Sequence, residues 1–165
     1  MTLTADDLKH LSSLFAPHEH EFLNDKIYIK ELPVCDRLDS VDPAWEWRIT
    51  KVEKTRVQAN SADANDAYQV TVYGDLTIKG VTRSGSGTAT FEYGLTTNAK
   101  TKVTKTQLYN EAEKSADTDA LKRAARRFGV GRYLLTAGTA VNERNLAKWL
   151  DHLSKNGYSH ASEWD

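Results

Sequence analysis

Residues 118–135 read TDALKRAARRFGVGRYLL, and this stretch decides how the rest of the chain is interpreted. It contains five basic residues and no acid between its first and last base: Lys122, Arg123, Arg126, Arg127 and Arg132. At ~100° per residue, the four bases before Phe128 occupy one arc of roughly 140° on a helix, and Leu121, Ala124 and Ala125 fall opposite. Gly129 and Gly131 then supply the left-handed residues that end such a helix. The stretch predicts a helix with one apolar face for a core and one cationic face for an anionic ligand.

The alternative for this cationic face is an ordinary solvated surface. Solvated helix faces normally mix charges of both signs at i,i+4 spacing, and here only Asp119 can pair in that way, with Arg123. An anionic ligand is therefore the favoured interpretation.

The chain has 165 residues, enough for one domain with a proper core, and a formal net charge of −1. We expect a single domain over residues 1–155, with its core at about 28–135, and a frayed tail at 156–165. The charge is unevenly distributed: residues 1–46 carry ten acids against four bases, whereas residues 122–148 carry seven bases against one acid. This asymmetry favours a local polyanion site, head-to-tail association of acidic and basic faces, or both.

The helix that ends near Phe128 is predicted to begin near Lys105, because Thr104 and Gln107 have the spacing of a capping box. Small residues recur every four positions along it, which lets a helix lie close against a sheet. These are Ala112, Ala116, Ala120 and Ala124.

The middle of the chain alternates with a period of two, which predicts strands. The alternation begins at Trp45, is clearest over residues 68–79, and returns over residues 89–93, with a tight turn at Lys79-Gly80. We interpret the glycine-rich run 84–87 as a bulged or flexible strand end. The predicted fold class is α+β: an antiparallel three- to four-stranded β-meander packed on one long α-helix.

Small elements flank this core in the prediction. They are helices over 4–15, 31–41 and 142–153 and a short strand at 27–29, and residues 17–25 are expected to be loop.

The residues support binding chemistry better than catalysis. No phosphate-binding lysine loop, nucleophile elbow or catalytic histidine motif is present, and Cys35 is the only cysteine, so we expect neither an enzyme nor a bound cofactor or metal. A basic helix beside basic strands would instead form a groove suited to a phosphodiester backbone. The strand residues in this predicted DNA-binding groove are Lys51, Lys54, Arg56 and Arg83.

Residues 118–129, preceded by an alanine-rich helix, resemble the signature helix of the Rad52 family of single-strand annealing proteins. The stretch 34–41 and the motif Trp45-Glu-Trp resemble that family's first helix and strand. Gly80-Val-Thr-Arg and residues 128–134 are similar to its bacterial branch, DNA damage response protein A (DdrA).

This resemblance implies a β-β-β-α core that assembles into a closed homo-oligomeric ring. Single-stranded DNA would lie in a basic groove with its bases outward, so that annealing needs no ATP and a coated 3′ end is shielded from nucleases. By the resemblance, Lys122, Arg123 and Arg126 contact the DNA backbone. Arg127 and Arg132 are included on charge and position alone.

The leading hypothesis is therefore an ATP-independent single-stranded DNA-binding protein of DNA repair and recombination, cytoplasmic and associated with the nucleoid, with no membrane partner. One alternative is a general RNA-binding module that uses the same groove. A second is a metal-dependent nuclease, built on the acids Asp36 and Asp39 or on the His18/His20 loop.

Overall fold

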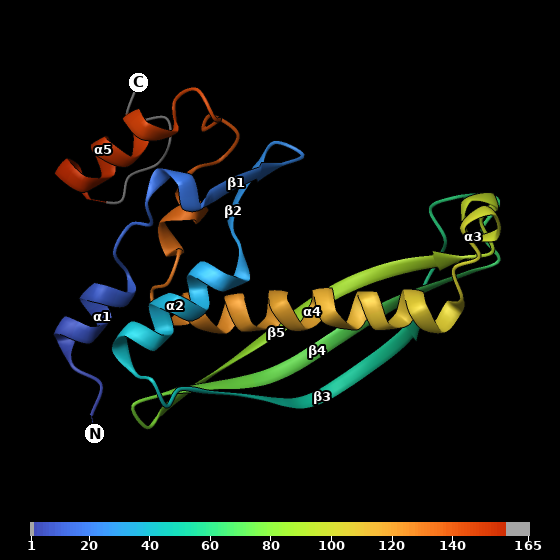
Figure 1. The fold of residues 1–165 in the computed structure, drawn as a ribbon, viewed down its shortest axis with the longest axis horizontal. Coiled ribbons are helices and arrows are strands. Elements are labelled where there is room, and N and C mark those ends of the chain that lie inside the picture. Colours follow the sequence, from blue (N-terminus) through green and yellow to red (C-terminus); the bar gives the residue numbers. More distant parts are fainter. Residues whose placement is uncertain (1, 158–165) are drawn as a thin grey trace. The chain divides into compact units, whose positions relative to one another are not determined.

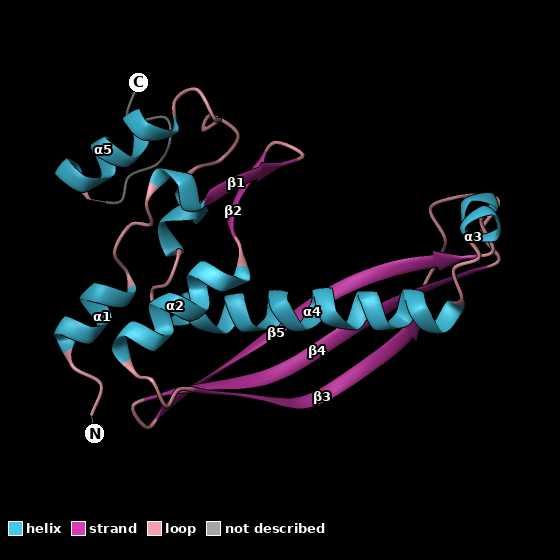
Figure 2. Ribbon diagram, viewed as in Figure 1, coloured by secondary structure: helices cyan, strands magenta, loops and turns pink. Residues whose placement is uncertain are grey.

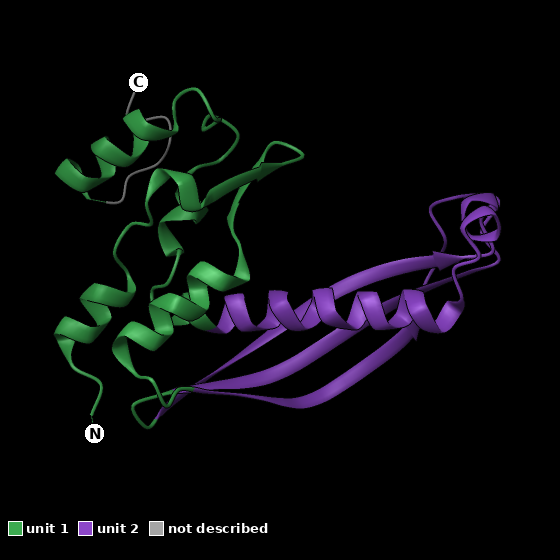
Figure 3. Ribbon diagram, viewed as in Figure 1, with its two compact units in different colours: residues 1–45, 78–80, 125–165 green, residues 46–77, 81–124 purple. Residues whose placement is uncertain are grey.

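The computed structural model describes residues 2–157, and these form two compact units (Figure 3). Within this range, unit 1 comprises residues 2–45, 78–80 and 125–157, and unit 2 comprises residues 46–77 and 81–124. The expectation of a single domain over 1–155 stays a prediction. Most of the expected frayed tail, from residue 158 onward, lies outside the described residues.

Unit 2 is built on a three-stranded sheet and a long helix, coloured as strand and helix in Figure 2. The strands β3 (Glu46–Arg56), β4 (Asp66–Ile78) and β5 (Val81–Tyr93) pair in the order β3-β4-β5, and the helix α4 (Lys105–Arg127) lies along them (Figure 1). The predicted α+β class is confirmed. A short helix that the sequence analysis did not anticipate, α3 (Thr96–Thr101), precedes α4.

The start of α4 follows from the capping box predicted at Thr104. The Thr104 hydroxyl accepts a hydrogen bond from the Gln107 amide at 3.2 Å, and the Gln107 side chain accepts one from the Thr104 amide at 2.8 Å. These two bonds satisfy amides that the helix itself leaves without partners.

The small-residue face of α4 packs directly on two glycines of β5. An added Cβ at Gly85 would lie 2.7 Å from the Ala124 amide, and one at Gly87 would lie 2.8 Å from the Asp119 Cβ. The expectation of a bulged or flexible strand end at 84–87 is wrong, because this run lies inside β5. Its glycines allow backbone-to-backbone contact with the helix.

The core of unit 2 forms between the helix and the sheet. It contains the buried residues Val70, Val72, Phe91, Ala112, Ala116 and Ala120. At one edge, the indole N–H of Trp47 donates a 2.7 Å hydrogen bond to Asp117 of α4. That bond satisfies the only polar atom of an aromatic ring that packs against the core.

Unit 1 consists of short elements. These are α1 (Ala5–Leu11), the 3-10 helix η1 (Pro17–Glu19), β1 (His20–Leu23), β2 (Lys26–Ile29), α2 (Glu31–Val41), the 3-10 helix η2 (Arg132–Thr136) and α5 (Leu146–Asn156). The helix predicted over 31–41 and the strand predicted at 27–29 are confirmed. The helices predicted over 4–15 and 142–153 are present but shorter at one end, since α1 ends at Leu11 and α5 begins at Leu146.

The prediction of loop over residues 17–25 is wrong. Residues 20–23 pair with residues 26–29 as an antiparallel hairpin. Asn24 and Asp25 form its turn with φ values of 50° and 59°, and this left-handed pair is the geometry that two-residue hairpins favour.

Tyr133 and Trp149 are fully buried in unit 1, with ring centroids 5.8 Å apart. Arg37 also ties this unit together: its guanidinium lies 4.0 Å from the centroid of the Phe15 ring and donates to the carbonyl of Ser13 at 2.7 Å.

Candidate nucleic-acid interface

The C-terminal part of α4 has the two faces that its sequence predicts. Leu121, Ala124, Ala125 and Phe128 are buried, each at most 3% exposed. On the other face, Arg123 and Arg127 are exposed, and Lys122 and Arg126 are half-buried. Gly129 follows with φ of 102°, which ends the helix as expected. The cationic face is therefore at the surface of the helix.

The contacts of two of these bases differ in kind. Arg123 forms an i,i+4 ion pair with Asp119 at 3.1 Å, with 56% of the Arg123 side chain exposed. Such an exposed pair is worth less than about 1 kcal/mol, so a phosphate can compete for this guanidinium.

Arg132 instead caps the end of α4. Its guanidinium donates to the Arg126 carbonyl at 3.0 Å and to the Arg127 carbonyl at 2.9 Å. The Arg126 carbonyl also accepts from the Gly129 amide at 2.9 Å, so Arg132 adds to the hydrogen bonds of this helix end, and a cation there also opposes the helix dipole. Arg132 therefore has a structural role, which sequence reasoning did not assign to it.

The structure places the strand bases on both faces of the sheet. Opposite residues in the β3–β4 register are Lys51 and Tyr73, Lys54 and Val70, and Arg56 and Tyr68. Val70 belongs to the core under α4, so Lys54 and Arg56 lie on the helix-facing side of β3, whereas Lys51 lies on the other face. Arg83 shares the face of Gly85 and Gly87 on β5, the face that packs against α4.

Lys54 belongs to an aromatic cluster that the sequence analysis did not find. Its ammonium lies 5.3 Å from the centroid of the Tyr68 ring and 5.0 Å from that of Tyr109. Lys105, which was not among the predicted site residues, donates to the Tyr68 hydroxyl and to Asp66, both at 2.9 Å. In the sequence, this cluster appears only as lysines and tyrosines on separate predicted elements. Packing of the tyrosines in the core would explain their positions equally well.

These contacts shift several protonation equilibria. The hydrogen bonds that the Lys105 ammonium donates to the Tyr68 hydroxyl and to Asp66 raise the pKa of Lys105, and the same ammonium lowers the pKa of Asp66. On the opposite sheet face, Glu53 raises the pKa of Lys51, with which it forms an ion pair. Both lysines therefore stay cationic at neutral pH.

Within unit 2 the predicted bases form two groups rather than one. Lys54 contacts Tyr109 near the start of α4, whereas Lys122 and Arg123 lie near its end. Tyr109 and Lys122 are thirteen positions apart on the helix, or ~20 Å at the helical rise. A bound polyanion would have to follow the helix to reach both groups.

The described part of the chain contains no group of three His, Cys, Asp or Glu side chains that could hold a metal ion. His20 is buried and hydrogen-bonds to Ala16 and Tyr133, and Asp39 accepts from the Trp45 indole at 2.6 Å. The alternative of a metal-dependent nuclease gains no support from these residues.

Among the described residues, no helix is both long enough and apolar enough to cross a membrane.

In a comparison with protein families, residues 17–149 match the family described as Rad52/22 family double-strand break repair protein. A comparison with curated proteins found no match. The matched range includes the hairpin of unit 1, the whole three-stranded sheet, α4, the loop that precedes α5 and the first residues of α5.

Proposed function

The chain belongs to the Rad52/22 family of double-strand break repair proteins, and on that premise we propose that it binds single-stranded DNA, without ATP, through the cationic face of α4. The observation that carries this proposal is the surface position of Lys122, Arg123 and Arg126 on a helix whose opposite face is buried. Arginine and lysine at such a face can bind successive phosphates, and each contact releases counterions.

The basic residues of the strands indicate that the bound DNA backbone would run along α4. Lys54, Arg56 and Arg83 lie on the same side of the sheet as α4, so they support a backbone track along the helix. Lys51 lies on the other face and is the weakest member of the proposed set. Arg127 is proposed on its exposed position beside Arg126, and Arg132 contributes chiefly by holding the helix end.

The finer function that we propose is coating and protection of 3′ single-strand ends, with annealing of complementary strands, by a protein of the DdrA branch. A homo-oligomeric ring is part of this proposal. Two features support it: β3 and β5 are both edge strands of the described sheet, and exposed edges invite further pairing. The acidic residues 1–46 and the basic residues 122–148 also have the charges needed for head-to-tail contact between copies.

Salt-dependent binding to a labelled oligonucleotide tests the DNA site. We expect Lys122→Ala with Arg126→Ala to weaken single-strand binding by roughly tenfold or more and to reduce the salt slope by about 1.4, at ~0.7 per phosphate contact on single strands. Lys114→Ala is the matched control, because Lys114 is an exposed base on the same helix. Equal affinity for single strands and duplex, or equal binding by the double variant and the control, would contradict the proposal.

Three further measurements test the competing functions and the ring. Matched DNA and RNA oligonucleotides in competition distinguish DNA binding from general RNA binding. Negative-stain images with and without single-stranded DNA test the ring, since a chain that stays monomeric on DNA contradicts it. Labelled DNA incubated with magnesium or manganese should remain uncut.

A further inference from the structure

The strand β1 forms a free outer edge of the two-stranded β1–β2 hairpin of unit 1. Its two-residue turn at Asn24 and Asp25 makes Leu23/Lys26 a hydrogen-bonded pair, so Glu21/Tyr28 is the next such pair and Phe22/Ile27 is not. The N–H and C=O of Phe22 therefore point away from β2. The hairpin is a two-stranded sheet in the described structure, and this donor and acceptor face outward from β1.

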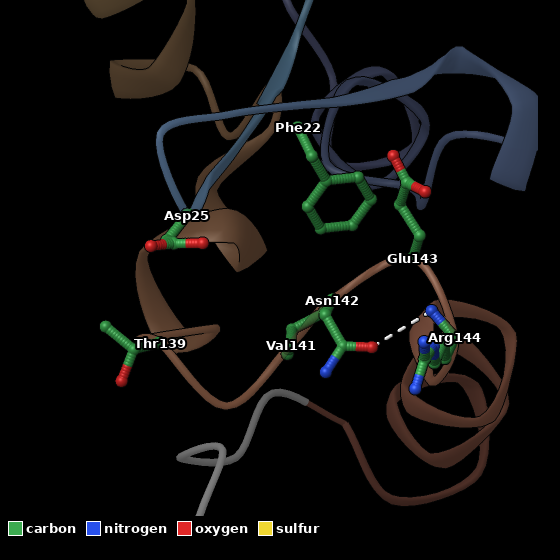
Figure 4. A pocket seen from close by; sticks show the side chains of 7 residues that line it. All are labelled: Phe22, Asp25, Thr139, Val141, Asn142, Glu143 and Arg144. Carbon is green, nitrogen blue, oxygen red and sulfur yellow. Dashed lines mark hydrogen bonds between the residues drawn. The ribbon is translucent and has the colours of Figure 1, made fainter.

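Two hollows adjoin this free edge, and Phe22 and Glu143 line both of them. The first has a volume of about 420 Å³ and is lined by Phe22, Asp25, Thr139, Val141, Asn142, Glu143 and Arg144 (Figure 4). The second has a volume of about 390 Å³, and its lining includes Pro17, His20 and Leu146. Each hollow is large enough for one bulky side chain, and all of their lining residues belong to unit 1.

The far wall of the hollows is held in place by its own hydrogen bonds. The Asn142 side chain accepts from the Arg144 amide at 2.9 Å, and the Asn145 side chain accepts from the Asn142 amide at 2.7 Å. The Asn145 amide group also donates to the Ala140 carbonyl at 2.8 Å. Because these bonds fix the loop before a ligand arrives, little ordering is needed on binding.

The rim is acidic. Asp25 and Glu143 are exposed, and neither has an ion-pair partner among the described residues, whereas Glu21 is already paired with Lys30 at 2.6 Å. Figure 4 shows the two carboxylates on either side of the Phe22 ring. Arg144 is the one base in the lining, so the rim attracts cationic groups and disfavours phosphates.

We propose that this edge binds an extended basic peptide of a partner protein by strand addition to β1. The peptide backbone pairs with the N–H and C=O of Phe22, apolar side chains enter the two hollows, and flanking Lys or Arg side chains meet Asp25 and Glu143. This mode combines main-chain hydrogen bonds for affinity with pockets for specificity. It is independent of DNA binding and gives the chain a docking site for a protein with an unstructured basic segment.

A labelled heptapeptide in which arginine and valine alternate is the probe, added to the full chain and followed by fluorescence polarisation. We expect saturable binding that becomes at least fivefold weaker in Asp25→Asn with Glu143→Gln. Asn tolerates the left-handed backbone of residue 25, so the first substitution preserves the turn. Asp6→Asn with Asp36→Asn removes two exposed acids of the same unit outside the hollows and serves as the control.

Two further probes test the binding mode. A peptide with glutamate in place of arginine should not bind, and methylation of the probe's alternate backbone amides should abolish binding. Hydrogen exchange of the Phe22 amide should slow in the complex. Equal binding by the acid variant and its control, equal binding of the glutamate peptide, or insensitivity to backbone methylation would each overturn the proposal. Binding of single-stranded DNA is measured in parallel on the same variants. A chain that binds DNA but not the peptide contradicts only the peptide site, whereas a chain that binds the peptide but not DNA contradicts only the proposed function.

Discussion

The Tyr133 hydroxyl donates a 2.6 Å hydrogen bond to Nε2 of His20, a residue 113 positions earlier in the chain. The direction of this bond follows from the other ring nitrogen. Nδ1 lies 2.9 Å from the Ala16 carbonyl, which can only accept, so Nδ1 carries the proton and Nε2 is the acceptor of a neutral ring. The Tyr133 hydroxyl in turn accepts from the Phe15 amide at 3.2 Å.

This arrangement predicts acid sensitivity of unit 1. Burial lowers the pKa of His20 below its usual 6.5, although the carbonyls of Ala16 and Pro17 and the nearby Glu19 oppose the shift. A histidine whose folded pKa is depressed contributes stability above the unfolded pKa and loses it as pH falls. We therefore expect the free energy of unfolding to fall as pH is lowered from about 7 through 6.5 and below, as measured by urea titration.

The control is His20→Phe, which keeps an aromatic ring and cannot be protonated. This variant should be less stable at pH 7.5, because it leaves the Tyr133 hydroxyl without its acceptor, and its stability should vary less between pH 7.5 and 5.5. An unchanged pH profile in the variant would contradict the role given to His20.

The close contact between β5 and α4 predicts that even one added methyl group on β5 lowers the stability of the fold. Gly85→Ala would bring a methyl group to 2.7 Å from the Ala124 amide and 2.8 Å from the Ala124 Cβ. Separating the helix from the strand to relieve this clash should cost roughly 1–3 kcal/mol in a thermal or urea melt. Ser86→Ala is the matched control, since Ser86 points to the opposite face of the same strand. Equal melting temperatures for the two variants would show that the close approach is not needed.

Regular periodicity made much of the fold predictable. The i,i+4 alanines and the capping box located α4, the period of two located β4, and α2 was predicted with its observed bounds. A short strand was predicted at 27–29, but its partner β1 was missed because four residues are too few to establish alternation. The run 84–87 was misjudged because its glycines indicate chain flexibility in isolation and close helix packing only when Ala120 and Ala124 lie against them.

The candidate site was predictable only in part. Helical geometry alone placed four bases of α4 on one arc, and the buried opposite face confirms that arrangement. The faces of β3 were not predictable, because the register shifts between Ile49 and Lys51. One extra residue inverts every side chain beyond it relative to Trp47 and Ile49. The three bases all lie beyond the shift, and alternation along the strand places Lys51 on the face opposite Lys54 and Arg56.

The variant Arg132→Lys tests whether the cap at the end of α4 needs a guanidinium group or only a positive charge. Arg132→Lys keeps the positive charge but loses the planar guanidinium that reaches the carbonyls of Arg126 and Arg127. We expect the variant to lose about 1 kcal/mol of stability in a urea titration, while its affinity for single-stranded DNA changes less than twofold. Arg127→Lys is the comparison, and it should leave stability closer to that of the parent chain. A large loss of DNA affinity in Arg132→Lys at unchanged stability would instead make Arg132 a direct contact.

The contribution of the Asp7–Lys79 ion pair to stability should depend on pH in the acid range. The two side chains meet at 2.9 Å and are 17% and 15% exposed, and the Lys79 amide also donates to the buried Asp42 at 2.6 Å. Hydrogen bonds from Lys79 and Thr4 lower the pKa of Asp7 from 3.8 to about 2. A depressed carboxyl pKa contributes stability that is fully present above the unfolded value and is lost as pH falls through the folded value.

The stability difference between the parent chain and Asp7→Asn should therefore be constant from pH 7 to about 5 and shrink as pH falls from about 4 to 2. Urea titrations at several pH values measure this difference. Asp6→Asn is the control, because Asp6 lies beside Asp7 in the same first turn of α1 and has no part in the pair with Lys79. If the Asp7→Asn difference were already lost at pH 5, or if Asp6→Asn reproduced it, the ion pair would not be the cause, and the acid sensitivity would belong to the helix end as a whole.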